Sequence, residues 1–269
     1  MTTLTKDPSG RRSVETTFEV PGTPEEVWQA IATGPGISAW LMPAEFEMRD
    51  GRPVAMTLDF GQGEPARSEV TTWDPPRLFG AQAPGLMPGS PPIASEWHVE
   101  ARSGDTCVIR LVTSLFASTD DWDDQLEYIE SGWSGFLRTL RLYLAHFRGQ
   151  PSTLVKWMVP VPGTEAQAWA SLTGAMGLQG AAVGQHWSAP AGVPALGGVI
   201  EYAHEAPNDV LVRLAAPGPG IAAFGSVDMG GQSYVGINLY LYGPQAAATA
   251  AREEPRWQAW VGETLAARA

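Results

Sequence analysis

Two stretches decide how this chain folds: Val20-Pro21-Gly22-Thr23-Pro24-Glu25-Glu26-Val27-Trp28 and Val161-Pro162-Gly163-Thr164-Glu165-Ala166-Gln167-Ala168-Trp169. They share Val-Pro-Gly-Thr and a Trp at the same distance, and the offset between them is 141 residues. Self-similarity at a large spacing is typical of a duplicated structural unit. We therefore predict that the 269 residues form two copies of one domain.

Each of these stretches predicts the end of a strand, then a turn, then the start of a helix. Alternating β-branched and polar residues lead up to Val20, as in a half-buried strand. Pro-Gly then turns the chain, and Thr23 with Glu26 three residues later is typical of a helix that starts with a capping box. The same turn and helix start are expected at Thr164.

Further strand-like pieces separated by turn residues follow in each copy. In the first copy they lie near residues 45–49, 53–60, 67–73, 77–82, 93–101 and 106–116, before a long amphipathic helix from about 120 to 147. In the second they lie near 199–204, 209–215, 221–228 and 233–242, between helices at 164–173 and 246–268. We predict a loose tail over 1–12, an intact domain over 13–149 and a shorter, degenerate copy over 153–269.

Composition excludes several classes of protein. A net charge of −12 disfavours binding to a phosphate backbone, so we expect no nucleic-acid partner. No apolar run reaches the roughly 18 residues that a membrane span needs, and the first residues lack the apolar stretch of a signal peptide. A single cysteine, Cys107, fits a reducing compartment, and we expect a cytoplasmic protein.

Charge is shared unevenly between the two halves. Residues 1–150 carry 12 basic and 21 acidic side chains, whereas residues 151–269 carry 5 and 8. So little charge predicts that the second half packs against the first copy or another subunit, as a homodimer or with a protein partner. The alternative is a coding bias toward Ala and Gly. If the second copy is a packing partner, it should leave less room for a ligand than the first.

Residues 24–31, the segment Ile37-Ser38-Ala39-Trp40-Leu41-Met42-Pro43 and Trp73-Asp74-Pro75-Pro76-Arg77-Leu78 resemble the START-like (SRPBCC, helix-grip) superfamily. Within it they are similar to the group named after the activator of the heat-shock protein 90 ATPase. The resemblance implies an α+β fold in which a curved antiparallel sheet wraps around a long C-terminal helix and encloses a deep apolar cavity. Relatives hold lipids or polyketides, some are cyclases, and the eponymous members are co-chaperones. Residues 153–269 fit only by analogy, because the Trp40-like turn and the Trp-Asp-Pro-Pro element are missing there.

In such a fold the middle of the closing helix faces the cavity. The predicted cavity lining is therefore mostly aromatic, with Trp97 pointing inward and its strand neighbour His98 outward. The candidate apolar lining residues are Trp40, Trp97, Ile129, Trp133 and Phe136.

Arg110 interrupts an otherwise apolar strand, Cys107 to Val112. It either points to solvent or faces the interior, where Glu69 or Glu96 would pair with it. An inward Arg110 could bind a ligand carboxylate, so we add Arg110 and Glu69 to the candidate cavity residues.

No pattern in the chain predicts a cofactor or a metal. The four histidines lack metal-ligand spacing, and neither the Gly132–Phe136 segment nor the Gly218–Ala223 segment completes a nucleophile or dinucleotide motif. We therefore expect the first domain to bind a hydrophobic small molecule without catalysis. The alternatives are a co-chaperone-like or other protein-interaction module, and an enzyme of the aromatic cyclase or dehydratase type.

Overall fold

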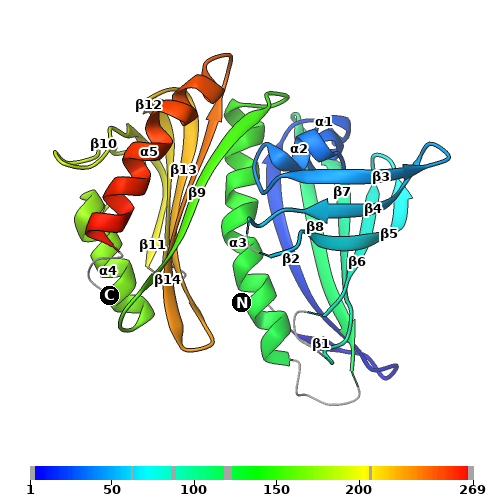
Figure 1. Ribbon diagram of the computed structural model, residues 1–269. Coiled ribbons are helices and arrows are strands. Elements are labelled where there is room, and N and C mark those ends of the chain that lie inside the picture. Colours follow the sequence, from blue (N-terminus) through cyan, green and yellow to red (C-terminus); the bar gives the residue numbers. More distant parts are fainter. Residues whose placement is uncertain (1–3, 62, 86–88, 118–122, 206–207, 266–269) are drawn as a thin grey trace. The chain divides into compact units, whose positions relative to one another are not determined.

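The computed structural model describes residues 4–61, 63–85, 89–117, 123–205 and 208–265. The side chains of residues 123–125, 127–131 and 205 are not described. The chain divides into two compact units, Met1–Gly149 and Gln150–Ala269, coloured from blue to green and from green to red in Figure 1. None of the described helices is both long and apolar enough to cross a membrane.

The first unit is a sheet with three helices. Its strands are β1 (Thr5–Lys6), β2 (Arg11–Pro21), β3 (Ala44–Arg49), β4 (Arg52–Leu58), β5 (Ala66–Asp74), β6 (Leu78–Ala83), β7 (Ile93–Arg102) and β8 (Thr106–Phe116). Its helices are α1 (Pro24–Ile31), α2 (Gly34–Ser38) and the long α3 (Asp123–His146).

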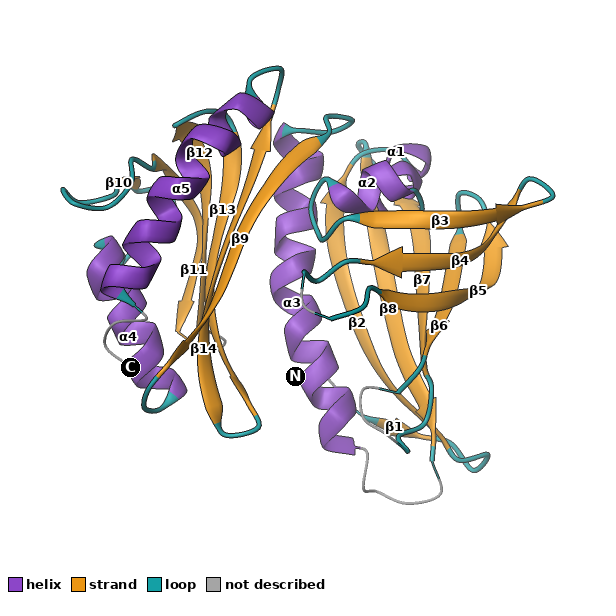
Figure 2. Cartoon of the chain, in the orientation of Figure 1, coloured by secondary structure: helices purple, strands orange, loops and turns teal. Residues whose placement is uncertain are grey.

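All strand pairs of this unit are antiparallel, in the order β1-β2-β8-β7-β6-β5-β4-β3. The helix α3 packs along β2 and β8, as Figure 2 shows for the first unit. Leu137, Leu140 and Leu144 of α3 are almost fully buried, because the apolar residues recur at three- and four-residue intervals on one side of the helix.

The second unit repeats this plan with fewer elements. Its strands are β9 (Ser152–Val161), β10 (His186–Ser188), β11 (Gly197–Glu205), β12 (Asn208–Ala216), β13 (Gly220–Met229) and β14 (Gln232–Tyr242). Its helices are α4 (Glu165–Met176) and α5 (Ala246–Thr264). The sheet order is β10-β11-β12-β13-β14-β9, again antiparallel throughout.

The two units have the same topology. In each, the first long strand pairs with the last one (β2 with β8, β9 with β14), and the strands between them form a meander. A helix follows the first strand directly and a second helix follows the last. The sequence prediction of an α+β fold with two tandem helix-grip domains is confirmed.

The repeated motif forms the same turn twice. Thr23 and Thr164 cap α1 and α4, and each helix closes its capping box with the residue three positions on, Glu26 or Gln167. Gly22 and Gly163 precede the caps with φ of 123° and 92°, which only glycine adopts without strain. These glycines therefore set the angle at which each strand enters its helix.

Candidate functional site

The first unit brings four of the predicted lining residues together in one aromatic chain. The ring of Trp97 lies 6.4 Å from that of Trp40 and 5.3 Å from that of Trp133, and Phe136 lies 6.4 Å from Trp133. All three contacts are edge-to-face, the geometry that aromatic pairs prefer. Trp40 and Trp97 are buried, whereas Trp133 and Phe136 of α3 stay partly exposed. The fifth residue, Ile129, has a side chain outside the described part of the chain.

A second aromatic cluster adjoins α1 in the same unit. Trp28 of α1 packs edge-on against Trp73 of β5 at 4.9 Å, and Trp73 in turn contacts Phe79 of β6 at 5.7 Å and Phe46 of β3 at 5.9 Å. Trp28 and Phe79 are buried. Here the space between the helix and the sheet is filled by rings.

The structure places the two charged candidates away from this interior. Arg110 alternates along β8 with Ile109 and Leu111, which are fully buried, so it lies on the opposite face of the sheet. There it pairs with Glu15 at 3.2 Å. Glu69 of β5 is exposed. The prediction that Arg110 and Glu69 line a cavity is corrected, because a cross-strand carboxylate on the outer face satisfies the guanidinium without any burial of charge.

Three further side chains of the first unit carry groups that could react: Glu96, His98 and Cys107. Glu96 also lies on the outer face and pairs with Arg11 at 3.0 Å. His98 is on that face too, and partial burial together with the Arg110 charge lowers its pKa. Cys107 is buried, its thiol contacts the Gly22 carbonyl at 3.1 Å, and burial raises its pKa, so it is a poor nucleophile.

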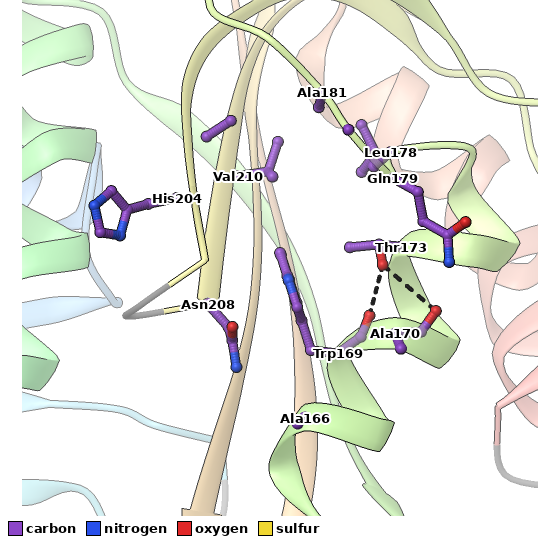
Figure 3. A pocket seen from close by; sticks show the side chains of 12 residues that line it. Ala166, Trp169, Ala170, Thr173, Leu178, Gln179, Ala181, His204, Asn208 and Val210 are labelled. Carbon is purple, nitrogen blue, oxygen red and sulfur yellow. Dashed lines mark hydrogen bonds between the residues drawn. The ribbon is translucent and has the colours of Figure 1, made fainter.

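The second unit contains a pocket of about 790 Å³ between α4, the segment after it, and strands β11 and β12. Figure 3 shows the Trp169 side chain projecting from α4 toward the strands that carry Val210 and Asn208. Apolar side chains line most of it, among them Trp169, Leu178, Ala203 and Val210. From the sequence we expected the shorter second copy to leave less room for a ligand than the first, so this pocket was not anticipated.

Strand register explains why this space is open. One row of paired residues crosses the first sheet as Trp73, Phe79, Trp97 and Leu111 on β5, β6, β7 and β8. The corresponding row in the second sheet is Ala203, Val210, Phe224 and Ile237 on β11, β12, β13 and β14. Trp73 is thus replaced by Ala203 and Phe79 by Val210.

The helices α1 and α4 are more alike at this place than the strands that face them. Trp169 stands at the offset of 141 residues from Trp28 and therefore has the same place on its helix. Trp28 packs against Trp73, but Trp169 faces Ala203 and Val210 across the pocket. The second unit has the helix tryptophan without the rings that cover it in the first unit.

A substitute for Trp40 is present in the second unit, although the sequence indicated none. Trp187 of β10 donates its indole N–H to the Met176 carbonyl of α4 at 3.1 Å, as Trp40 does to the Ala30 carbonyl of α1 at 2.9 Å. Trp187 also contacts Phe224 at 6.1 Å, the register counterpart of Trp97. The residue was missed because it comes from a different place in the repeat, after the helix and a Gly-rich segment.

Four of the described residues that line the pocket have polar side chains: Thr173, Gln179, His204 and Asn208. Asn208 donates from Nδ2 to Glu165 Oε1 at 3.2 Å and to Ser226 Oγ at 3.1 Å. Because a carboxylate only accepts hydrogen bonds, this fixes the orientation of the amide and leaves Oδ1 as the acceptor that Asn208 offers. Thr173 donates its hydroxyl to the Trp169 carbonyl at 2.8 Å, one of the dashed bonds in Figure 3.

The first unit matches one family model. Residues 11–141 match the family described as polyketide cyclase/dehydrase and lipid transport. No curated protein matches the chain in sequence. The narrower resemblance to the heat-shock protein 90 activator group stays a prediction.

Solved structures similar to the chain include two that span both units. The di-domain ARO/CYC BexL from the BE-7585A biosynthetic pathway is 13% identical over 94% of this chain and 95% of its own, with a TM-score of 0.44. DynU16, a putative protein in the dynemicin biosynthetic locus, is 16% identical over 94% and 96%, with a TM-score of 0.42. The Aha1 dimer from Colwellia psychrerythraea is 20% identical over 51% of this chain and 98% of its own, with a TM-score of 0.39.

Proposed function

We propose that the first unit binds a hydrophobic small molecule against Trp133 and Phe136 and catalyses no reaction on it. The observation that carries this proposal is the aromatic chain from Trp40 through Trp97 to these two rings, which keep part of their surface exposed. Partly exposed rings on a rigid buried base are a favourable surface for an apolar ligand. The description of the matching family names polyketides and lipids, which are molecules of this kind.

The positions of the three charged candidates, Arg110, Glu96 and Glu69, favour a binding role over an enzymatic one. General acid–base catalysis needs an ionisable group within hydrogen-bond reach of the substrate. Arg110 and Glu96 lie on the outer face of the sheet in ion pairs, and Glu69 is exposed. A cyclase or dehydratase is the second candidate, favoured by the description of the matching family.

The proposal is tested with an apolar dye, 1-anilinonaphthalene-8-sulfonate, added to the full chain and displaced by hydrophobic compounds. Trp133→Ala should weaken dye binding at least tenfold, since about 1.4 kcal/mol of lost contact suffices for that. Phe116→Ala is the matched control, because Phe116 is 62% exposed and lies outside the aromatic chain. Equal dye binding by Trp133→Ala and the wild type would reject the proposal. Turnover of a bound compound would favour the enzyme instead.

A further inference from the structure

The pocket of the second unit lies where residues at matching positions of the two units differ in size. Its helix wall carries Trp169, at the place where the first unit has the packed Trp28. Its sheet wall carries Ala203 and Val210, where the first unit has Trp73 and Phe79. The strands β11 to β14 follow the same order as β5 to β8, while the described part of the second unit has no counterpart of α2 or of the β3–β4 hairpin. Smaller side chains on β11 and β12, together with these missing elements, account for the open space beside Trp169.

We propose that this pocket binds a neutral, planar aromatic molecule that carries a hydroxyl group, such as a phenol or a naphthol. The volume of about 790 Å³ falls within the range of small-molecule sites, roughly 300–1,000 Å³. The planar ring is inferred from Trp169, whose counterpart Trp28 packs against a ring 4.9 Å away. A ligand ring would give Trp169 the contact that Ala203 cannot supply.

Charge and hydrogen bonding narrow the ligand class. Among the described residues that line the pocket, none is an Asp, Glu, Lys or Arg, and the one histidine, His204, is exposed and points away from Trp169 in Figure 3, so an ionic ligand gains little from charge there. Glu165, hydrogen-bonded to Asn208 at 3.2 Å, places a carboxylate behind this wall and disfavours an anion. The acceptor Oδ1 of Asn208 can receive a hydrogen bond from a ligand, and a phenolic hydroxyl is a neutral donor at pH 7.

The test measures binding of 2-naphthol to the full chain by calorimetry, in the Trp133→Ala background so that the first unit contributes little. Ala203→Trp should weaken binding at least tenfold, because it places in the pocket the side chain that the first unit has at this register position. Ala191→Trp adds the same indole at an exposed position that does not line the pocket, and should change the affinity less than twofold. If Ala203→Trp does not fold, Val210→Phe, which restores only the smaller ring, decides the question.

The hydroxyl is tested separately with 2-methoxynaphthalene, which has the same ring but no donor. It should bind about two- to twelvefold more weakly, since one neutral hydrogen bond contributes about 0.5–1.5 kcal/mol. Binding of 2-naphthoate should be weaker still. Equal affinity for 2-naphthol in the folded Ala203→Trp or Val210→Phe variant, or no binding by the parent, overturns the site. Preference for the methoxy compound or for naphthoate overturns the ligand class. Because these readouts concern only the second unit, they are independent of dye binding at Trp133.

Discussion

Trp28 and Trp169 have matching positions in the two copies but opposite surroundings. Trp28 is 5% exposed and its ring lies 4.9 Å from Trp73. Trp169 is only partly buried, and the residue in the register place of Trp73 is Ala203. The surroundings of a tryptophan on a helix thus depend on strand residues that are far away in sequence.

Replacing Trp73 with alanine should open the first unit at the corresponding place. Trp73 contacts three aromatic rings, those of Trp28, Phe46 and Phe79, all of which would lose a neighbour. Because Trp73 is only partly buried, we expect Trp73→Ala to lower the free energy of unfolding by about 2–4 kcal/mol, below the full cost of a buried Trp truncation. Urea unfolding followed by circular dichroism measures this, with Trp73→Phe as a milder control. A loss below about 0.5 kcal/mol would show that the cluster does not stabilise the unit.

The capping boxes predict a difference in pH dependence between the copies. The hydrogen bond from the Thr23 backbone N–H, together with the nearby Arg148 charge, lowers the pKa of Glu26 from its ordinary value of 4.5. A lowered folded-state pKa stabilises the protein above the unfolded pKa, and this contribution is lost as the pH falls through the folded value. The second copy has the neutral Gln167 at this place.

Glu26→Gln should therefore make the first unit less stable at pH 7, and the deficit should shrink as the pH is lowered from about 4.5 toward 3. Thermal unfolding of the variant and the wild type at pH 7 and pH 3 measures this convergence. The control is Gln167→Glu, which introduces a titrating capping box into the second unit. A deficit of equal size at both pH values would show that the carboxylate charge of Glu26 contributes nothing.

Single-residue reasoning from the sequence worked where strand alternation decides orientation. It predicted that Trp97 points inward and His98 outward, as the structure shows. It retained Arg110 and Glu69 as interior candidates because alternation leaves the identity of the buried face open until the neighbouring strands are known. The Glu15 partner of Arg110 comes from β2, 95 residues away, and spacing cannot predict such a contact.

At the scale of elements, the turns before α1 and α4 depend on Gly22 and Gly163. A Cβ at Gly163 would lie 2.4 Å from Gln167 Oε1, the atom that closes the capping box, whereas at Gly22 the nearest atom, Glu26 Oε2, is 3.1 Å away. Alanine at either position must adopt a positive φ. The turn in the second unit therefore tolerates a side chain less well than the turn in the first.

Gly163→Ala should lower the free energy of unfolding by about 1–3 kcal/mol through backbone strain, and by more than Gly22→Ala does. Gly262→Ala is the control. It lies within α5 with open space around its missing Cβ, so alanine should stabilise that helix by about 0.5–1 kcal/mol. Chemical denaturation of the three variants measures the order. A Gly163→Ala variant as stable as the wild type would mean that the turn does not require a left-handed residue.

Helices and strands with a clear hydrophobic period were predicted closely. The predicted strand at 106–116 has the same bounds as β8, and the predicted final helix from residue 246 starts where α5 does. The short β10 was missed, because three residues within a Gly-rich segment carry no period. Because β10 was not predicted, Trp187 was not recognised as the residue that hydrogen-bonds to the Met176 carbonyl and packs against Phe224.

At the scale of the whole molecule, the two proposed sites have no residue in common. We expect Trp133→Ala to weaken dye binding at least tenfold while the second unit binds 2-naphthol with the same affinity, and Ala203→Trp to weaken 2-naphthol binding at least tenfold while dye binding at Trp133 is unchanged. The physical reason is that no lining residue of the pocket belongs to the first unit. Calorimetric titration of the double variant against both single variants measures this. A change at one site caused by a substitution at the other would show coupling between the units.

The pocket itself could have been suspected from the repeat. Aligning the copies at the offset of 141 residues keeps Trp169 in the place of Trp28, while the Trp-Asp-Pro-Pro element has no counterpart. A retained helix tryptophan with a missing partner is a sign of an opened core. The row Ala203, Val210, Phe224 could not be read in advance, because it depends on the register of three strands and on a bulge between Ile200 and Tyr202.

The emptied row also bears on how such a chain can change over generations. A large-to-small replacement in a core normally costs several kcal/mol, a large part of the margin by which a small domain stays folded. In a chain with two copies of one fold, one sheet can carry large rings in this row while the other carries smaller side chains. Because the two sheets share this register, the residues in one row are a set that the same strand arrangement accommodates in the other unit. Exchanging residues along this row between the units is therefore a route to new binding specificities that the fold has already tolerated.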